Sequence, residues 1–154
     1  MTRVKICGIT EAVHASAAAE AGADFIGLVF APSKRQVTPK RAYEIVMAMR
    51  GFKNHPLAVG VFVNTPAPEV NRAAERCGLD WVQLSGDEPW DCLRDIKWPF
   101  IKAIRVPGEA DADAVFAGMS LGYKLLERDF IYLLDSHVEG SYGGTGQVFD
   151  WRLA

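Results

Sequence analysis

The sequence predicts an α/β fold in which parallel strands alternate with helices. Runs rich in Val, Ile, Leu and Phe recur along the 154 residues, and stretches with helical periodicity separate them. The strand-helix unit repeats roughly every 25 to 30 residues, as in a βα-repeat barrel or a doubly wound sheet. Polar residues also follow directly after the apolar runs. Strand alternation alone does not separate the barrel from the doubly wound sheet.

Six strands are expected, each a short apolar run of the kind that is buried in a parallel sheet. They are predicted at residues 3–7, 24–30, 57–63, 81–84, 100–105 and 130–135. The whole chain, 1–154, is interpreted as a single domain of about six βα units, because its length provides one substantial core.

Helices are predicted between the strands from their capping residues. The alanine-rich stretch 11–21 follows Thr10, taken as N-cap, and stops at Gly22 in the position typical of a C-terminal glycine. A second helix, 40–49, follows Thr38 and Pro39, a cap and a proline suited to the first helical position.

Three further helical stretches are expected in the rest of the chain. The segment 66–77 has apolar residues at helical spacing and ends at Gly78. The segment 88–96 is predicted as a fourth helix, and 111–128 as a longer stretch interrupted by Gly118 and Gly122.

Functional side chains are expected where the strands end. Cys7 closes the first strand and Asp135 closes the last, which offers a potential base and a potential acid. Other polar residues that follow strands are Ser33, Lys34, Arg35, Asn64, Ser85, Asp87, Glu88 and Arg105. In a βα barrel all these strand ends lie on one face, where such folds keep their active sites.

Composition narrows the class of partner. The formal net charge is −2, and acidic and basic residues are interleaved, which disfavours nucleic-acid binding. No apolar run approaches the ~18 residues that span a bilayer, and the N-terminus lacks a signal-peptide core. A small-molecule partner and a cytoplasmic location are therefore expected.

The three cysteines, Cys7, Cys77 and Cys92, show no CxxC spacing. An odd number without that spacing argues against a disulfide framework and against a zinc site. We expect reduced thiols, with Cys77 and Cys92 packed in the core and Cys7 facing an open site.

Ten segments form a distinctive series across nearly the whole chain: residues 4–10 (VKICGIT), 21–24 (AGAD), 27–30 (GLVF), 33–35 (SKR), 59–64 (VGVFVN), 82–84 (VQL), 101–103 (IKA), 134–136 (LDS), 142–146 (YGGTG) and 149–151 (FDW). With these segments in this order, the sequence resembles the phosphoribosylanthranilate isomerase family of tryptophan biosynthesis.

The resemblance implies a TIM-type (β/α)8 barrel and an Amadori rearrangement of a phosphorylated aminoaldose, without metal or cofactor. It implies that Cys7 removes the proton from sugar C2′ and that Asp135 protonates the furanose ring oxygen. It also implies that Arg35 meets the anthranilate carboxylate. Gln83 and the glycines Gly143 and Gly144 are implied as substrate-binding residues.

The residues themselves are compatible with these roles but leave simpler ones open. The thiol of Cys7 needs a helix N-terminus or a cation such as Lys5 to favour its thiolate, and Asp135 needs a desolvated pocket to hold a proton. Alternatively, Cys7 is a small core residue, Asp135 caps a turn and Arg35 is a solvated charge. The run containing Gly143 is alternatively a flexible loop.

The sequence departs from the family at two places. A full barrel of this type takes about 200 residues or more, so the resemblance implies that the seventh and eighth strands are lacking. Exposed edges of an incomplete barrel favour a homo-oligomer or a separate completing chain. Ser85 stands where the family commonly has histidine.

Two other functions compete with the isomerase hypothesis. One is a non-catalytic partial barrel that acts as an assembly module through its open edges. The other is a different sugar-phosphate isomerase, which the segment 33–35 disfavours because it suits an aromatic acid.

Overall fold

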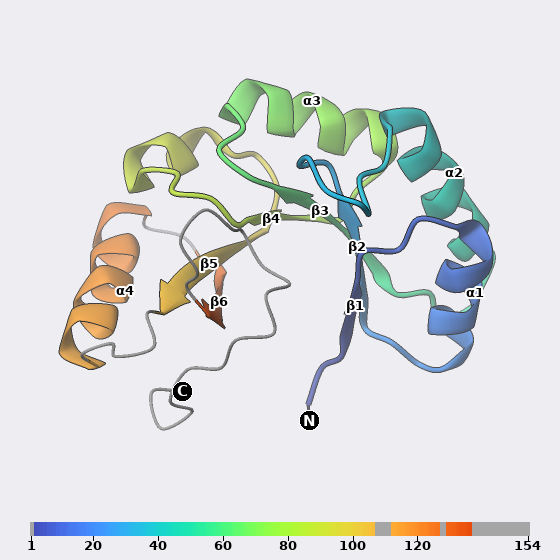
Figure 1. The fold of residues 1–154 in the computed structure, drawn as a ribbon, viewed down its shortest axis with the longest axis horizontal. Helices are drawn as coiled ribbons and strands as arrows, with labels where there is room; N and C mark the ends of the chain where they lie inside the picture. The colour runs from blue at the N-terminus through green and yellow to red at the C-terminus, as the bar shows by residue number, and fades with distance from the viewer. Residues whose placement is uncertain (1, 107–111, 127–128, 137–154) are drawn as a thin grey trace.

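Six parallel strands form one curved sheet (Figure 1). The computed structural model describes residues 2–106, 112–126 and 129–136. The strand order along the sheet is β1-β2-β3-β4-β5-β6, the order of the sequence. The strands are β1 (Lys5–Cys7), β2 (Phe25–Val29), β3 (Leu57–Phe62), β4 (Trp81–Leu84), β5 (Phe100–Val106) and β6 (Ile131–Ser136). The expected fold class is confirmed as a partial barrel.

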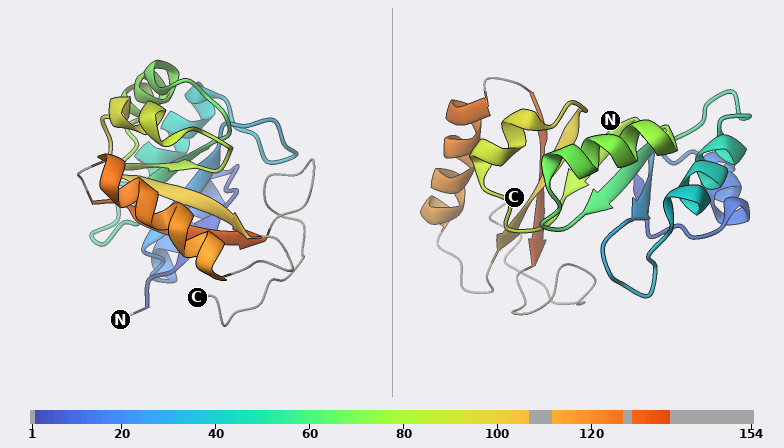
Figure 2. Two further views of the ribbon diagram at one scale, coloured as in Figure 1. Left: turned by 90° about the vertical axis from the view of Figure 1, so that its left-hand side faces the viewer. Right: turned by 90° about the horizontal axis from the view of Figure 1, so that it is seen from above.

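Helices cover the convex side of the sheet, and the strands share one direction (Figures 1 and 2). The helices are α1 (Ala12–Glu20), α2 (Pro39–Met49), α3 (Ala67–Cys77), the 3-10 helix η1 (Trp90–Asp95) and α4 (Ala112–Leu126). Because every strand pair is parallel, the carboxyl ends of all six strands lie along the same rim of the sheet. This rim brings together the side chains that follow the strands.

The main core lies between the sheet and the helices. Ile26 and Leu28 of β2, Val82 and Leu84 of β4 and Phe100 of β5 are fully or almost fully buried there. Burying large aliphatic and aromatic side chains contributes about 1.5–3 kcal/mol each. The convex side is therefore the part of the sheet that holds the fold together.

The concave side of the sheet is less covered. A separate small cluster of Phe25, Val59, Trp81 and Ile101 lies there. Toward the β6 edge, Ile131 and Leu133 are each 37% exposed. Side chains two residues apart in a strand share a face. Residues an even number of positions from a member of this cluster in the same strand therefore also point to the concave side.

The fourth predicted helix is present but shorter than expected: the 3-10 helix η1 covers Trp90–Asp95 and not the whole of 88–96. The side chain of Asn71 explains where it ends. Asn71 donates to the Asp95 carbonyl at 2.8 Å and accepts from the Lys97 amide at 3.0 Å. These bonds take the backbone groups that would otherwise extend the helix, and Ile96 is extended.

The predicted cap of the first helix was wrong. The N-cap of α1 is Glu11 and not Thr10, and its side chain makes no capping bond. Arg41 of α2 instead donates to the Thr10 carbonyl at 3.1 Å and pairs with the Glu11 carboxylate. The other predicted caps are confirmed: Thr38 accepts from the Arg41 amide, and Gly22 and Gly78 have positive φ.

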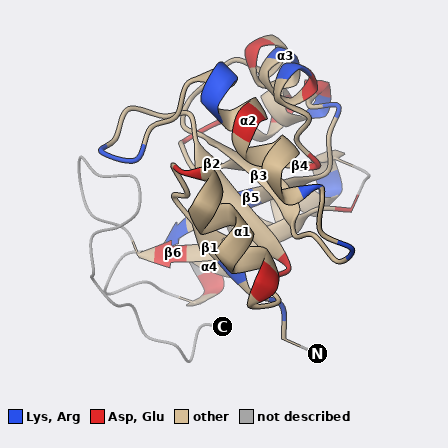
Figure 3. Ribbon diagram, turned by 90° about the vertical axis from the view of Figure 1, so that its right-hand side faces the viewer, with Lys and Arg blue, Asp and Glu red and all other residues tan. Residues whose placement is uncertain are grey.

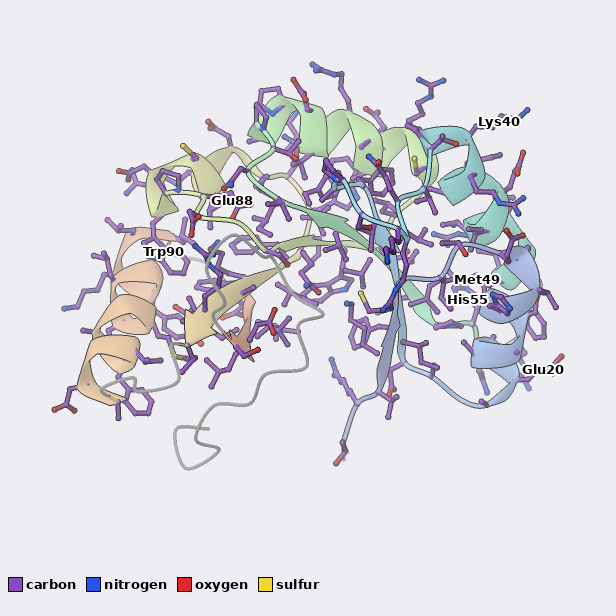
Figure 4. The ribbon with its side chains drawn as sticks, in the orientation of Figure 1. Glu20, Lys40, Met49, His55, Glu88 and Trp90 are labelled. Atoms are coloured by element: carbon purple, nitrogen blue, oxygen red, sulfur yellow. The ribbon has the colours of Figure 1, made fainter. Side chains whose placement is uncertain are left out.

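The last described helix, α4, runs without interruption through both glycines that were expected to break it. Gly122 has a packing role, because an added Cβ would lie 2.6 Å from the Trp90 ring and 2.7 Å from the Tyr132 hydroxyl. Trp90, the first residue of η1, lies on the side of η1 that faces α4 (Figure 4). The glycine therefore allows α4 to approach η1 and β6 closely.

Charged residues of both signs are interspersed on the helices that Figure 3 shows. Among the described residues, no helix combines the length and apolar character needed to cross a bilayer.

Candidate active site

Cys7 occupies the carboxyl end of β1 and is exposed. It lies in register with Gly27 of β2. An added Cβ at Gly27 would lie 2.7 Å from the Cys7 Sγ and 3.0 Å from the Lys5 Nζ. The thiol and the ammonium therefore share the space above this glycine, as the alternation of β1 predicts. The core alternative for Cys7 is wrong.

Arg35 reaches back from the segment after β2 to the end of β1. Its Nη1 donates to the Cys7 carbonyl at 3.3 Å. The side chain crosses Gly8, where an added Cβ would lie 2.5 Å from the Arg35 Cδ. Gly8 has a φ of 83°, a left-handed conformation that favours glycine. The structure thus brings the cation of Arg35 next to the exposed cysteine.

Asp135 lies near the carboxyl end of β6, directly opposite Arg105 in the β5–β6 register. Ile101, a member of the concave cluster, and Arg105 lie an even number of residues apart in β5, so they share a face of the sheet. Ile131 and Asp135 are their register partners in β6. The side chains of Arg105 and Asp135 therefore both point to the concave face. Cys7 and Asp135 belong to the two outermost described strands, at the same rim of the sheet.

Gln83 points to the concave face from β4 and is 6% exposed. Its Nε2 donates to the Ser85 hydroxyl at 2.8 Å, whereas its Oε1 has no hydrogen-bond partner among the described residues. A buried acceptor without a partner is unfavourable for folding. Gln83 thus lies below the concave surface with a free acceptor among the described residues, and its role as a substrate-binding residue stays a prediction.

A buried network lies on the other side of β5, and the sequence prediction missed it. Lys102 and Glu88 form an ion pair at 2.6 Å, and both side chains are 6% exposed. Lys102 also donates to the Gly86 carbonyl at 2.7 Å, and Glu88 accepts from the amides of Gly86 and Asn64 at 3.0 and 2.8 Å. A lysine inside an apolar strand was the available signal, since buried charges are normally paired.

The same segment places a second, more exposed ion pair at the rim. The Asp87 carboxylate pairs with the Arg105 guanidinium, and the two side chains are 55% and 20% exposed. A cavity of about 360 Å³ is bordered by this pair and by Lys102, Glu88 and Trp90. It adjoins the end of β5, beside the strand that carries Asp135.

Two titratable groups outside the candidate site, on Cys77 and Tyr132, have pKa values raised by burial. Burial raises the pKa of the Cys77 thiol above its usual value, and burial together with Tyr123 raises the pKa of Tyr132 to about 12. Cys77 lies in the core as predicted, whereas Cys92 is exposed and its core prediction was wrong. Gly143 and Gly144 lie outside the described residues.

Comparison with known proteins decides which family has this arrangement. The family model described as N-(5′-phosphoribosyl)anthranilate (PRA) isomerase matches residues 4–154. The chain belongs to the PRA isomerase family. The N-(5′-phosphoribosyl)anthranilate isomerase of Dehalococcoides mccartyi is 45% identical over 153 residues, which cover 99% of this chain and 70% of that protein.

Solved PRA isomerases have the same fold. The crystal structure from Thermotoga maritima superposes with a TM-score of 0.79 at 36% identity, covering 99% of this chain and 70% of that chain. A PRA isomerase in complex with reduced 1-(o-carboxyphenylamino)-1-deoxyribulose 5-phosphate gives a TM-score of 0.72 at 36% identity, covering 89% and 66%. These matches support the isomerase hypothesis over the assembly module and over a different sugar-phosphate isomerase.

Proposed function

We propose that this chain catalyses the Amadori rearrangement of N-(5′-phosphoribosyl)anthranilate, with Cys7 as general base and Asp135 as general acid. The observation that carries the proposal is the exposed thiol of Cys7 at the strand-end rim, with the Arg35 guanidinium bonded to the carbonyl of the same residue. The Lys5 ammonium shares this space, because an added Cβ at Gly27 would lie 2.7 Å from the Cys7 Sγ and 3.0 Å from the Lys5 Nζ. The PRA isomerase family membership supports the same reaction.

The proposed reaction needs two proton transfers by residues of this chain, followed by tautomerisation of the enol. Asp135 gives its proton to the furanose ring oxygen, the C1′–O bond breaks, and the nitrogen lone pair forms a C1′=N bond. The Cys7 thiolate then takes the C2′ proton, and that bonding pair forms C1′=C2′ while the C1′=N π pair returns to nitrogen. The enol becomes the ketone when a proton moves from the C2′ hydroxyl to C1′. Cys7 then releases its proton to solvent and Asp135 takes one up, which restores both groups for the next turnover.

The remaining predicted residues have binding roles in this proposal. Arg35 is the cation for the anthranilate carboxylate, because its guanidinium lies beside Cys7 and is suited to a planar carboxylate. Gln83 lines the concave face with an amide oxygen that has no partner among the described residues. We assign Gly143 and Gly144 to substrate binding on the sequence resemblance.

Substitution of Cys7 tests the proposal. The assay follows the loss of anthranilate-adduct fluorescence with freshly generated substrate. We expect Cys7→Ser to lower kcat at least a hundredfold, since a positioned base contributes about 10²- to 10⁴-fold. Cys92→Ser is the matched control, because Cys92 is also exposed, and it should retain the full rate. Equal rates for Cys7→Ser and the unsubstituted chain would contradict the proposed base.

The setting of the activity is also part of the proposal. We infer that residues 1–154 act as one βα domain in the cytoplasm on a small phosphorylated substrate. The interleaved charges support a partner other than nucleic acid. The reduced state expected for its three cysteines fits the same compartment.

We further propose that another copy of this chain or a separate chain covers the sheet edges. Val4 and Ile6 at the β1 edge are 51% and 38% exposed, and Ile131 and Leu133 at the β6 edge are each 37% exposed. Exposed apolar strand edges favour association. Sedimentation velocity should show a discrete complex, and a monomer at all concentrations would argue against a second copy.

A further inference from the structure

Arg105 is placed where it faces the proposed general acid. It is the register partner of Asp135, and both side chains point to the concave face. Neighbouring strands lie about 4.8 Å apart, so a guanidinium on β5 reaches a carboxyl group on β6. Within the described residues, however, no ion pair or hydrogen bond joins Arg105 to Asp135; the Arg105 guanidinium contacts the Asp87 carboxylate instead.

The direction of this guanidinium matters for acid catalysis. A general acid must carry its proton when the substrate arrives. A guanidinium in contact with a carboxyl group favours the charged form, which has already lost that proton. An arginine opposite Asp135 is therefore unfavourable for the proposed reaction unless another group holds its charge.

The backbone around Asp87 is held from several sides. The Asn64 side-chain oxygen accepts from the Asp87 amide at 2.7 Å. On one side of Asp87, the Gly86 amide and carbonyl are bonded to Glu88 and Lys102. An added Cβ at Gly86 would lie 2.3 Å from the Asn64 Oδ1, so this close packing requires glycine. The buried Lys102–Glu88 pair thus fixes the segment that presents the Asp87 carboxylate.

We propose that Asp87 is a positioning residue, a counter-charge that holds the Arg105 guanidinium away from the carboxyl group of Asp135, the proposed proton donor. This inference rests on the proposed role of Asp135. The proposed role gives the Asp87–Arg105 ion pair a function other than stabilising the fold. With side chains 55% and 20% exposed, such a pair adds only about 0–1 kcal/mol to stability.

Asp87→Asn tests the role, because it keeps the shape of the side chain and removes the charge. We expect Arg105 to turn to Asp135 and kcat to fall about tenfold or more, with KM within about threefold and the thermal midpoint almost unchanged. The double variant Asp87→Asn/Arg105→Met removes the displaced cation, and its kcat should return to within about threefold of the unsubstituted chain. A pair with only a structural role gives no such rescue.

Asp91→Asn is the matched control. Asp91 lies four residues after Asp87 and also approaches an arginine, Arg94, at 4.0 Å. Asp91→Asn should leave kcat unchanged. An Asp87→Asn chain with full kcat, or a double variant as slow as the single one, would overturn the counter-charge role.

A crystal structure of the Asp87→Asn chain separates this inference from the proposed function. The Arg105 guanidinium should lie on the Asp135 carboxylate, and a guanidinium still turned away from Asp135 would overturn the inference whatever the activity. The Cys7-dependent rate of the unsubstituted chain, in contrast, tests the proposed reaction without reference to Asp87.

Discussion

The two faces of β5 carry two ion pairs that differ in burial. On the convex face, Lys102 and Glu88 are both 6% exposed and are joined to the backbone of Gly86. On the concave face, Arg105 and Asp87 are 20% and 55% exposed. Breaking a buried pair leaves an uncompensated charge, whereas an exposed pair contributes little to stability. The convex pair therefore serves the fold, and the concave pair is available to serve the chemistry.

The same contrast holds for the sheet as a whole. Its convex face packs against the helices through fully buried side chains such as Leu28, Leu84 and Phe100. Its concave face keeps Cys7 exposed and leaves the Gln83 Oε1 without a partner among the described residues. Stability and candidate chemistry are thus assigned to opposite sides of one set of strands.

The largest expected effect comes from breaking the buried pair. Lys102→Met leaves the Glu88 carboxylate buried and unpaired, so we expect about 3–5 kcal/mol of destabilisation in urea unfolding. Lys102→Met/Glu88→Gln should recover part of this loss, because it removes the buried charge. Asp87→Asn, on the exposed pair, should cost about 1 kcal/mol or less. Equal losses from Lys102→Met and Asp87→Asn would contradict the division between the two faces.

A smaller effect is expected at the turn that follows β1. Gly8→Ala places a side chain at a φ of 83°, with its Cβ 2.5 Å from the Arg35 Cδ. We expect about 1–3 kcal/mol of destabilisation from the strained backbone. KM should rise, because Arg35 is displaced from Cys7. Thermal unfolding and initial rates measure the two effects.

Gly118→Ala is the control for this glycine. Nothing lies within 4 Å of an added Cβ at Gly118, and the residue lies inside α4. Alanine there should stabilise the chain by about 0.5–1 kcal/mol and leave KM unchanged. A higher KM in both variants would show that the position of Arg35 is not what Gly8 controls.

Much of the fold was predictable because its signals are local. Apolar runs predicted all six strands, and the positive φ values of Gly22 and Gly78 confirm the predicted helix ends. The errors arose where distant residues decide the outcome. The side chain of Asn71 bonds to the backbone at the end of η1, and the side chain of Arg41 bonds to the Thr10 carbonyl. A residue-by-residue pattern contains no information about such contacts.

The candidate site was predictable only in part. The position of Cys7 at an open strand end and its proximity to Lys5 follow from the alternation of β1 and are confirmed. The adjacency of Arg35 to Cys7 depends on how the segment after β2 folds back. The ion pairs of Lys102 and Arg105 depend on the β4–η1 segment. Strand register, and not sequence spacing, puts Arg105 opposite Asp135.

Alkylation of Cys7 tests most directly whether the concave rim carries the reaction. In a Cys92→Ser chain treated with iodoacetamide near pH 8, Cys7 should react while Cys77 stays unmodified, because burial raises the pKa of the Cys77 thiol and lowers its thiolate fraction. Mass spectrometry measures the modification. The account predicts that isomerase activity falls in proportion to the fraction of Cys7 modified. Full activity in a chain whose Cys7 is completely alkylated would contradict it.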